Sequence, residues 1–295
     1  GTIKTVESGG YYSLDPFVTP WFTTPHAMIF DTLATTDLNN QNTPHLAESW
    51  DVSEDGTIVT IKIREGIIFH DGTPFDADAA KWNLDRFFDP ETGAQVGQNL
   101  AALVTSVDVV DPLTIQLNMT SAYAPLFTDL GILYMVSPTA YEALGKDGFG
   151  LAPVGTGEFK FESVVPDDML TLVKNEAYTW APAFAETDAP PPADGLTVKY
   201  LADEAVIYAS LETGELNITG VPPQYLPQAE ANPDIETVEG IDWVVWYLGF
   251  NLTKAPYDDI NVRQAIAFAL DREEIVLAAF DGVGYPLFGP LSPSI

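Results

Sequence analysis

Apolar residues in this chain come in short runs separated by turn residues, and this spacing is the strongest limit on its fold. The run at 243–250 is among the longest, has the length of a strand and is followed by polar residues. No run approaches the roughly 20 apolar residues that a membrane-spanning helix needs. With 295 residues, of which 46% are hydrophobic, the chain is long enough for one large domain or two ordinary ones with a packed core.

The clearest local pattern is a hairpin followed by an amphipathic helix. Asp55-Gly56 is a strong turn signal, and residues 58–64 after it alternate between apolar and polar side chains, as in a half-buried antiparallel strand. Asp76 predicts the start of a helix, because a carboxylate there accepts hydrogen bonds from the first backbone N–H groups. That helix places three apolar residues on one face, Ala80, Leu84 and Phe87.

Similar patterns recur along the rest of the chain. Further strands are predicted at residues 3–6, 107–111, 113–117, 158–163, 169–174, 195–201, 216–219 and 243–251. Further helices are predicted at residues 26–33 with Thr24 as the capping residue, 138–144, 203–213 and 259–280. This mixture of strands and helices predicts an α/β fold.

The charge balance excludes one class of partner. The chain has 43 acidic and 12 basic residues, which gives a formal net charge of −31. Such a surface repels the phosphates of DNA and RNA, and no basic stripe offsets it. Nucleic-acid binding is therefore not expected.

The sequence offers little for catalysis. Cysteine is absent, which removes disulfides, thiolate nucleophiles and cysteine-bound zinc. The only histidines are His26, His45 and His70, and no Gly-x-Ser-x-Gly motif accompanies them. His70 lies beside Asp71 in a glycine-containing turn, where turn hydrogen bonding accounts for both residues. No catalytic residue is assigned.

Two further motifs resemble ligand-binding loops but lack residues that such loops require. Asp51-x-Ser53-x-Asp55-Gly56 resembles the first half of a calcium loop, but Lys62 stands at the twelfth position, where a bidentate acid is required. Gly155-x-Gly157 is too short for a dinucleotide fingerprint and precedes a strand instead of opening a helix. The sequence predicts no metal and no cofactor.

Six stretches, in a fixed order over residues 1–285, resemble the dipeptide-, oligopeptide- and nickel-binding proteins of ABC importers, the family 5 extracellular solute-binding proteins. The most specific is the turn Phe69-His70-Asp71-Gly72-Thr73-Pro74-Phe75. The others are Ser13-Leu14-Asp15-Pro16, residues 46–56, Pro153-Val154-Gly155-Thr156-Gly157, residues 209–216 and residues 250–265. The chain departs from the family at Glu158, where members often carry proline.

The resemblance implies a periplasmic-binding-protein-like clamp of two lobes, of type II, with an inserted extra subdomain. Lobe one would comprise residues 1–32 and 147–250, and residues 33–146 would form the inserted subdomain. Residues 251–295 would begin lobe two, which would be largely missing. The strand at 3–6 should share a sheet with strands from 158–250, and apolar side chains around 260–290 should be left uncovered.

The resemblance also implies a function. The protein would be the extracytoplasmic substrate-binding component of an ABC importer, periplasmic or lipid-anchored at the cell surface. It would be a monomer that captures a small solute, a peptide above all, between its lobes and delivers it to a membrane permease. A sugar oligomer, an opine or a metal chelate would also suit the family. Two alternatives stay open: a secreted hydrolase that uses carboxylates, and a ligand-sensing receptor module of the same fold.

Aromatic residues are the candidates for ligand contact, because they bind small organic molecules through a large contact area. We expect the large aromatics nearest the predicted loops and hinge to line the cleft, since the family places ligand contacts there. They are Trp21, Phe22, Tyr134, Trp246 and Tyr247. If 243–251 is a strand, Trp246 and Tyr247 face opposite sides, so that one can line the pocket while the other fills the core.

Overall fold

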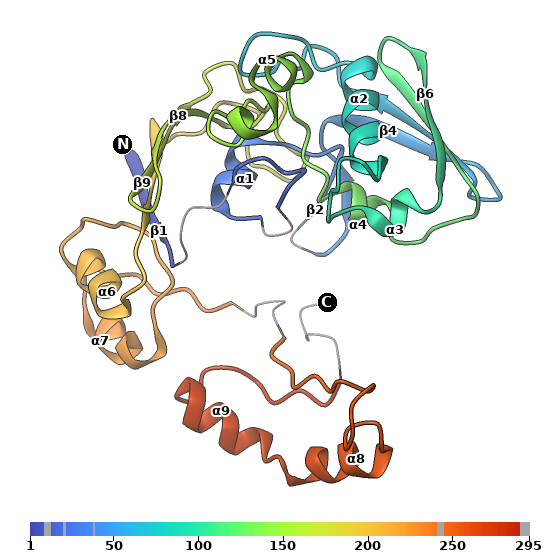
Figure 1. Ribbon diagram of the computed structural model, residues 1–295. Coiled ribbons are helices and arrows are strands. Elements are labelled where there is room, and N and C mark those ends of the chain that lie inside the picture. Colours follow the sequence, from blue (N-terminus) through green and yellow to red (C-terminus); the bar gives the residue numbers. More distant parts are fainter. Residues whose placement is uncertain (9–12, 20–21, 38, 241–244, 290–295) are drawn as a thin grey trace. The chain divides into compact units, whose positions relative to one another are not determined.

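The computed structural model describes residues 1–8, 13–19, 22–37, 39–240 and 245–289. The chain divides into two compact units, Gly1–Thr219 and Gly220–Ile295, each of which is described by itself (Figure 1). Among the described residues, every helix falls short of the length and apolar character that crossing a membrane requires.

The first unit contains an antiparallel sheet built around the predicted hairpin. Its strand order is β4-β5-β7-β6, with bounds β4 Ala47–Val52, β5 Ile58–Ile63, β6 Val104–Asp111 and β7 Thr114–Met119. The alternation in β5 is observed: Val59, Ile61 and Ile63 are fully buried, whereas Lys62 is exposed. The Asp55 carboxylate accepts hydrogen bonds from Thr57 N–H and from two hydroxyls of the turn, which confirms the hairpin.

Helix α2 (Ala77–Phe88) packs against β6 and β7 (Figure 1). As predicted, Asp76 caps it by accepting a hydrogen bond from Ala79 N–H at 3.0 Å. Ala80, Leu84 and Phe87 are fully buried on one face. Burying a leucine or phenylalanine side chain stabilises the fold by about 1.5–3 kcal/mol, so this face accounts for the attachment of the helix to the sheet.

The second large sheet of this unit joins distant parts of the sequence. Its order is β1-β10-β9-β8, with bounds β1 Thr2–Glu7, β8 Phe159–Val165, β9 Met169–Lys174 and β10 Gly195–Tyr200. β1 pairs with β10 in parallel, and the other pairs are antiparallel. The predicted sharing of a sheet between the strand at 3–6 and strands after residue 158 is confirmed.

The strand predicted at 216–219 is wrong. Residues 216–219 lie against the open edge of β1, but the side chain of Asn217 makes much of the contact. Its Oδ1 accepts from Lys4 N–H at 2.8 Å, and its Nδ2 donates to Thr2 C=O at 3.0 Å. The amide therefore takes the place of a strand partner along this edge.

Smaller elements complete the first unit: the pair β2 (Ala34–Thr36) and β3 (Asn42–Pro44), and the helices α1 (Thr24–Ile29), α3 (Gln98–Ala101), α4 (Leu126–Leu130), α5 (Pro138–Phe149) and α6 (Glu204–Glu212). The helix predicted at 26–33 begins earlier than expected, at Thr24, with Thr23 and not Thr24 as its capping residue. It also ends earlier, because Phe30 is already extended. The predicted helix at 138–144 runs on to Phe149, past a break at Gly145 with φ 68°.

The second unit contains the 3₁₀ helix η1 (Pro223–Tyr225) and the helices α7 (Leu226–Ala231), α8 (Ile260–Ala269) and α9 (Arg272–Phe280). The single helix predicted at 259–280 is therefore wrong. Leu270 is extended, and Asp271 starts a new helix by accepting a hydrogen bond from Glu274 N–H.

Apolar side chains are exposed along α8 and α9, neither of which contains a buried residue. Phe268 is 90% exposed, Leu277 68% and Phe288 84%. The predicted uncovered apolar residues around 260–290 are confirmed. The strand predicted at 243–251 is wrong over its described part, since residues 245–251 pair with no strand among the described residues. A strand is stable only when a neighbour satisfies its backbone groups.

The boundaries of the predicted lobes and of the inserted subdomain stay predictions. The antiparallel sheet takes all its strands from residues 47–119, and the mixed sheet takes its strands from 2–7 and 159–200.

We predict that Asp76→Ala lowers the free energy of unfolding by about 1 kcal/mol, because the first turn of α2 loses its side-chain cap. Urea denaturation of the purified chain measures this. Asp78→Ala is the matched control, since it removes a carboxylate from the same turn that makes no capping bond. Equal losses in the two variants would show that charge, and not the hydrogen bond, stabilises this end.

Candidate functional site

An aromatic group in the first unit brings together two of the predicted ligand-contact residues. The rings of Phe22 and Tyr134 lie 4.9 Å apart, nearly perpendicular to one another. His26 on α1 completes the group, 5.4 Å from Phe22 and 6.5 Å from Tyr134 between ring centres. Phe22 and Tyr134 are half-buried, and His26 is fully buried. We call Phe22, His26 and Tyr134 the aromatic wall.

The core supports the aromatic wall from behind. Phe30 follows α1, and its ring centre lies 6.1 Å from that of Tyr134. Phe30 in turn stacks on Phe149 at 6.3 Å. Both phenylalanines are buried, so their packing restricts the wall to one arrangement.

His26 is held in its neutral form. Its Nδ1 accepts a hydrogen bond from Thr23 N–H at 3.2 Å, which requires that nitrogen to be unprotonated. Burial lowers the pKa of His26 to about 4, and a neighbouring backbone contact at Ser13 opposes this shift. The imidazole buried against Phe22 and Tyr134 is therefore uncharged at neutral pH.

Tyr134 keeps its proton. Burial of the hydroxyl, together with the nearby Asp31 carboxylate, raises the pKa of Tyr134 to about 12. The group is thus apolar in its faces, with a phenol as a hydrogen-bond donor. Such a surface suits noncovalent contact with an organic ligand.

Asp31, which lies near Tyr134, is a buried carboxylate with several hydrogen-bond partners. Its Oδ2 accepts hydrogen bonds from Thr156 Oγ1 at 2.9 Å and from Trp180 Nε1 at 3.1 Å. Its Oδ1 lies 3.5 Å from Nε2 of His45, which lies 3.3 Å from the Tyr178 hydroxyl. All five side chains are at least nine-tenths buried. Burial lowers the pKa of His45, against the opposing effect of Asp31.

The motifs that carry the family resemblance meet beside Asp31. His70 N–H donates to Gly155 C=O, and His70 Nε2 lies 2.9 Å from Gly157 C=O. Gly155 and Gly157 press against the backbone of residues 28–29 so closely that a Cβ atom at either position would collide with it. Burial lowers the pKa of His70 to about 4, so this histidine is neutral too.

Asp71 follows the predicted turn chemistry. Its carboxylate accepts from Thr73 N–H and the Thr73 hydroxyl, and also from Ser137 Oγ at 2.6 Å. Ser137 is the capping residue of α5. The pair His70 and Asp71 therefore serves to join segments of the fold, with no geometry of a catalytic dyad.

A second buried carboxylate, Asp15, belongs to a separate cluster. It accepts from Phe17 N–H and from the Tyr141 hydroxyl. Arg86 donates to the same hydroxyl and lies 4.3–5.2 Å from the ring centres of Tyr141, Phe17 and Trp82. Burial raises the pKa of Asp15, and these hydrogen bonds oppose that shift. The Asp15 carboxylate, the Tyr141 hydroxyl and one guanidinium nitrogen of Arg86 are thus linked by hydrogen bonds, so we assign the cluster to the core and not to the ligand site.

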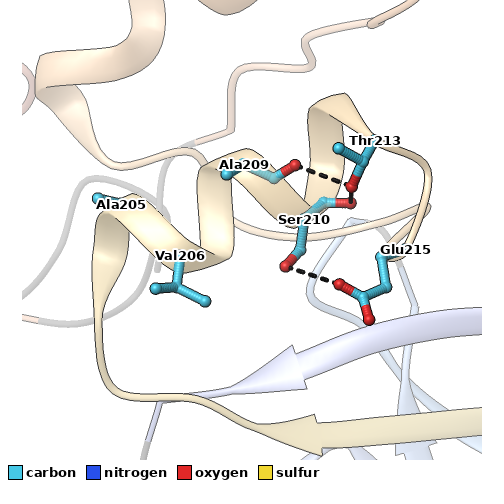
Figure 2. Close-up of a pocket in the computed structure, with 6 residues that line it drawn as sticks. All are labelled: Ala205, Val206, Ala209, Ser210, Thr213 and Glu215. Atoms are coloured by element: carbon cyan, nitrogen blue, oxygen red, sulfur yellow. Dashed lines mark hydrogen bonds between the residues drawn. The ribbon is translucent and has the colours of Figure 1, made fainter.

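A surface hollow of about 390 Å³ lies on α6 (Figure 2). Small residues form most of its lining. Its polar groups bond to one another: Ser210 Oγ donates to Glu215, and the Thr213 hydroxyl donates to the carbonyls of Ala209 and Ser210 (Figure 2). We do not consider it the ligand site, because its hydrogen-bonding groups are already paired with each other.

The remaining predicted contacts are placed differently. Trp21 lies outside the described residues. Trp246 and Tyr247 belong to the second unit and are 81% and 85% exposed. The expectation that one of them fills a core is therefore wrong, since the segment that carries them is not a strand. The ring centre of Trp246 lies 6.2 Å from that of Phe280.

Sequence reasoning missed Asp31, Thr156, Trp180 and Asn83. Asn83 alone carried a signal, as a polar residue within the apolar face of an amphipathic helix. The partners of Asp31 lie up to 149 residues away in the sequence, so no local pattern could reveal them. Among the described residues, no group of three potential metal ligands is found.

The sequence model of one protein family, the bacterial extracellular solute-binding proteins, family 5, matches residues 41–295. The chain belongs to this family. The α/β fold of the periplasmic-binding-protein type expected from the sequence is thereby confirmed.

Three related proteins illustrate the similarity. The glutathione-binding protein GsiB of Shigella flexneri is 34% identical over 253 residues, which are 85% of this chain and 48% of that protein. The oligopeptide-binding protein AppA of Bacillus subtilis, solved with a nonapeptide, superimposes with a TM-score of 0.87 at 22% identity, over 100% of this chain and 58% of that one. NikA of Brucella suis, solved with Fe(III)-EDTA, superimposes with a TM-score of 0.81 at 25% identity, over 96% of this chain and 57% of that one. The chain thus spans about half the length of the curated relatives it matches.

The neutral state of His26 predicts a pH dependence of stability. The pKa of His26 is about 4 in the folded chain and 6.5 when exposed, so between these values only the unfolded chain gains the proton. The free energy of unfolding should fall as pH drops from about 6.5 to about 4, by up to about 3 kcal/mol from this residue, and level off below. His26→Asn should lose less stability than the wild type between pH 7 and pH 5.

Urea denaturation at the two pH values measures the difference. His45 and His70 are present in both proteins, so their contributions cancel in the comparison. An equal loss in the two proteins would show that His26 is not held neutral.

Proposed function

We propose that this protein is the extracytoplasmic substrate-binding component of an ABC importer, which captures a peptide or a similar small solute and delivers it to a membrane permease. Membership of family 5 of the extracellular solute-binding proteins carries the proposal. The aromatic wall supports it from the structure, because it offers partly exposed rings and a phenol donor on a rigid support.

Peptides are the solute class that we favour. GsiB is named for glutathione, a tripeptide, and AppA was solved with a nonapeptide. NikA was solved with a metal chelate, so a chelate is the next class to test. Uncharged rings favour a ligand with apolar side chains, and the acidic chain disfavours a strongly anionic one.

We propose Phe22 and Tyr134 as ligand contacts, together with Trp21, Trp246 and Tyr247 from segments outside the aromatic wall. Phe22 and Tyr134 have the strongest support, because their rings are in contact and remain partly exposed. Trp246 and Tyr247 expose most of their surface within their own unit, which leaves their rings available to a ligand.

Binding without catalysis fits the chemistry of the site. His26 is fully buried, His70 Nε2 lies 2.9 Å from Gly157 C=O, and the buried carboxylates of Asp15 and Asp31 are already hydrogen-bonded. A hydrolase would need an accessible acid and base at the ligand. We therefore propose a binding protein that is not an enzyme. From its family we further propose that it is a monomer, periplasmic or anchored at the cell surface by lipid.

Isothermal titration of the chain with a panel of solutes tests this function. The panel contains glutathione, a dipeptide, a nonapeptide, Fe(III)-EDTA and a maltotriose control. We expect saturable binding of at least one peptide and no change in the recovered peptide by mass spectrometry. Binding of neither a peptide nor Fe(III)-EDTA, or cleavage of a peptide, would contradict the proposal, and binding of Fe(III)-EDTA alone would overturn peptides as the solute class.

Substitution of the aromatic wall tests the site itself. We predict that Phe22→Ala and Tyr134→Ala each weaken binding of the panel peptide by on the order of tenfold or more, because each removes a large apolar contact. Phe127→Ala is the matched control: Phe127 is also half-buried and stacks on Trp50 at 4.1 Å, away from the wall. A similar loss of affinity in all three variants would indicate a general loss of structure instead.

A further inference from the structure

The segment 133–137, which carries Tyr134, is held by hydrogen bonds although it is not a strand. Met135 N–H donates to Asp31 C=O at 2.9 Å, beside the aromatic wall. Ser137 N–H donates to Val154 C=O at 3.0 Å. These two bonds leave the backbone groups of Val136 to be satisfied by something else.

Asn83 supplies both missing partners from α2. Its Oδ1 accepts from Val136 N–H at 2.9 Å, and its Nδ2 donates to Val136 C=O at 2.9 Å. The second hydrogen of the amide goes to Ala79 C=O in the preceding turn of the helix, also at 2.9 Å. Asn83 is fully buried. A single amide thus pairs with Val136 as a neighbouring strand would.

We infer that Asn83 is a positioning residue for the ligand-contact residue Tyr134. It fixes the backbone two residues after Tyr134, while Asp31 C=O fixes the residue between them. Together these bonds hold Tyr134 against Phe22 and His26. The effect on ligand binding rests on the proposed function, whereas the effect on the position of the ring does not.

Only an amide at this position satisfies Val136 completely. Leucine has a similar size but would leave both a buried N–H and a buried C=O without a partner. Aspartate would keep the acceptor for Val136 N–H, but its ionised form would place a charge against two carbonyl oxygens. The residue therefore acts through its paired donor and acceptor and not through its volume.

The position of Tyr134 can be followed without a ligand. We would label the chain with 3-fluorotyrosine and assign the Tyr134 ¹⁹F resonance by its loss in Tyr134→Phe. The edge-to-face contact with Phe22 should shift this resonance away from that of an exposed tyrosine. Asn83→Ala should move it toward the exposed value, and Asn83→Asp, which keeps one bond, should move it less.

Asn175→Ala is the matched control. Asn175 is also a buried asparagine that bonds to backbone, through Nδ2 to Gly157 C=O at 3.0 Å and through Oδ1 from Ala177 N–H at 3.3 Å. It should lower the thermal midpoint as Asn83→Ala does and leave the Tyr134 resonance in place. If Asn83→Ala does not fold, Asn83→Asp decides the same question.

Titration with glutathione as the probe completes the test. We expect Asn83→Ala to weaken glutathione binding on the order of tenfold, as Tyr134→Ala does, and Asn175→Ala to leave it within about twofold of the wild type. An unmoved Tyr134 resonance in both Asn83 variants would overturn the positioning role. A moved resonance with unchanged glutathione affinity would uphold that role and overturn Tyr134 as a ligand contact.

Discussion

A carboxylate that is removed from water must be fully hydrogen-bonded, and the first unit is organised around that constraint at Asp31. The side chains that satisfy Asp31 come from the segment before β4, from the Gly-Thr-Gly loop and from the segment after β9. The loop reaches Asp31 only because Gly155 and Gly157 allow it to lie against the end of α1. Breaking one of these contacts would leave a buried polar atom without its hydrogen-bond partner, which costs about 1–3 kcal/mol.

Hydrogen bonds to Asp31 and to the turn at Thr23 hold the aromatic wall in place. Tyr134 is attached to Asp31 through the backbone of Met135, and His26 is attached to Phe22 through the turn at Thr23. Burial keeps His26 uncharged at neutral pH, so the wall contains no charged ring. A preformed wall of this kind loses little conformational entropy when a solute is bound.

Local patterns predicted local structure well. The hairpin at Asp55-Gly56 and the face of α2 were found from the sequence because their contacts lie within a few turns of chain. The strands at 216–219 and 243–251 were predicted from local sequence patterns; the first, and the second over its described part, are wrong because a strand needs a partner that a local pattern cannot specify. The site residues divide in the same way: aromatic character indicated Phe22 and Tyr134, whereas Asn83 depends on a partner 53 residues away.

The amide of Asn217 has a consequence for the way copies of this chain meet one another. β1 lies at the open edge of the mixed sheet, and an unpaired edge is a template on which another polypeptide can add a strand. Asn217 already occupies Lys4 N–H and Thr2 C=O, and the backbone N–H groups of Asn217 and Ile218 occupy Lys4 C=O. The alternation of free donors and acceptors that a second molecule would have to match is thus interrupted in the middle of the strand. Asn217 and Ile218 therefore make the addition of a second molecule's strand at this edge unfavourable, in a protein with many exposed apolar residues.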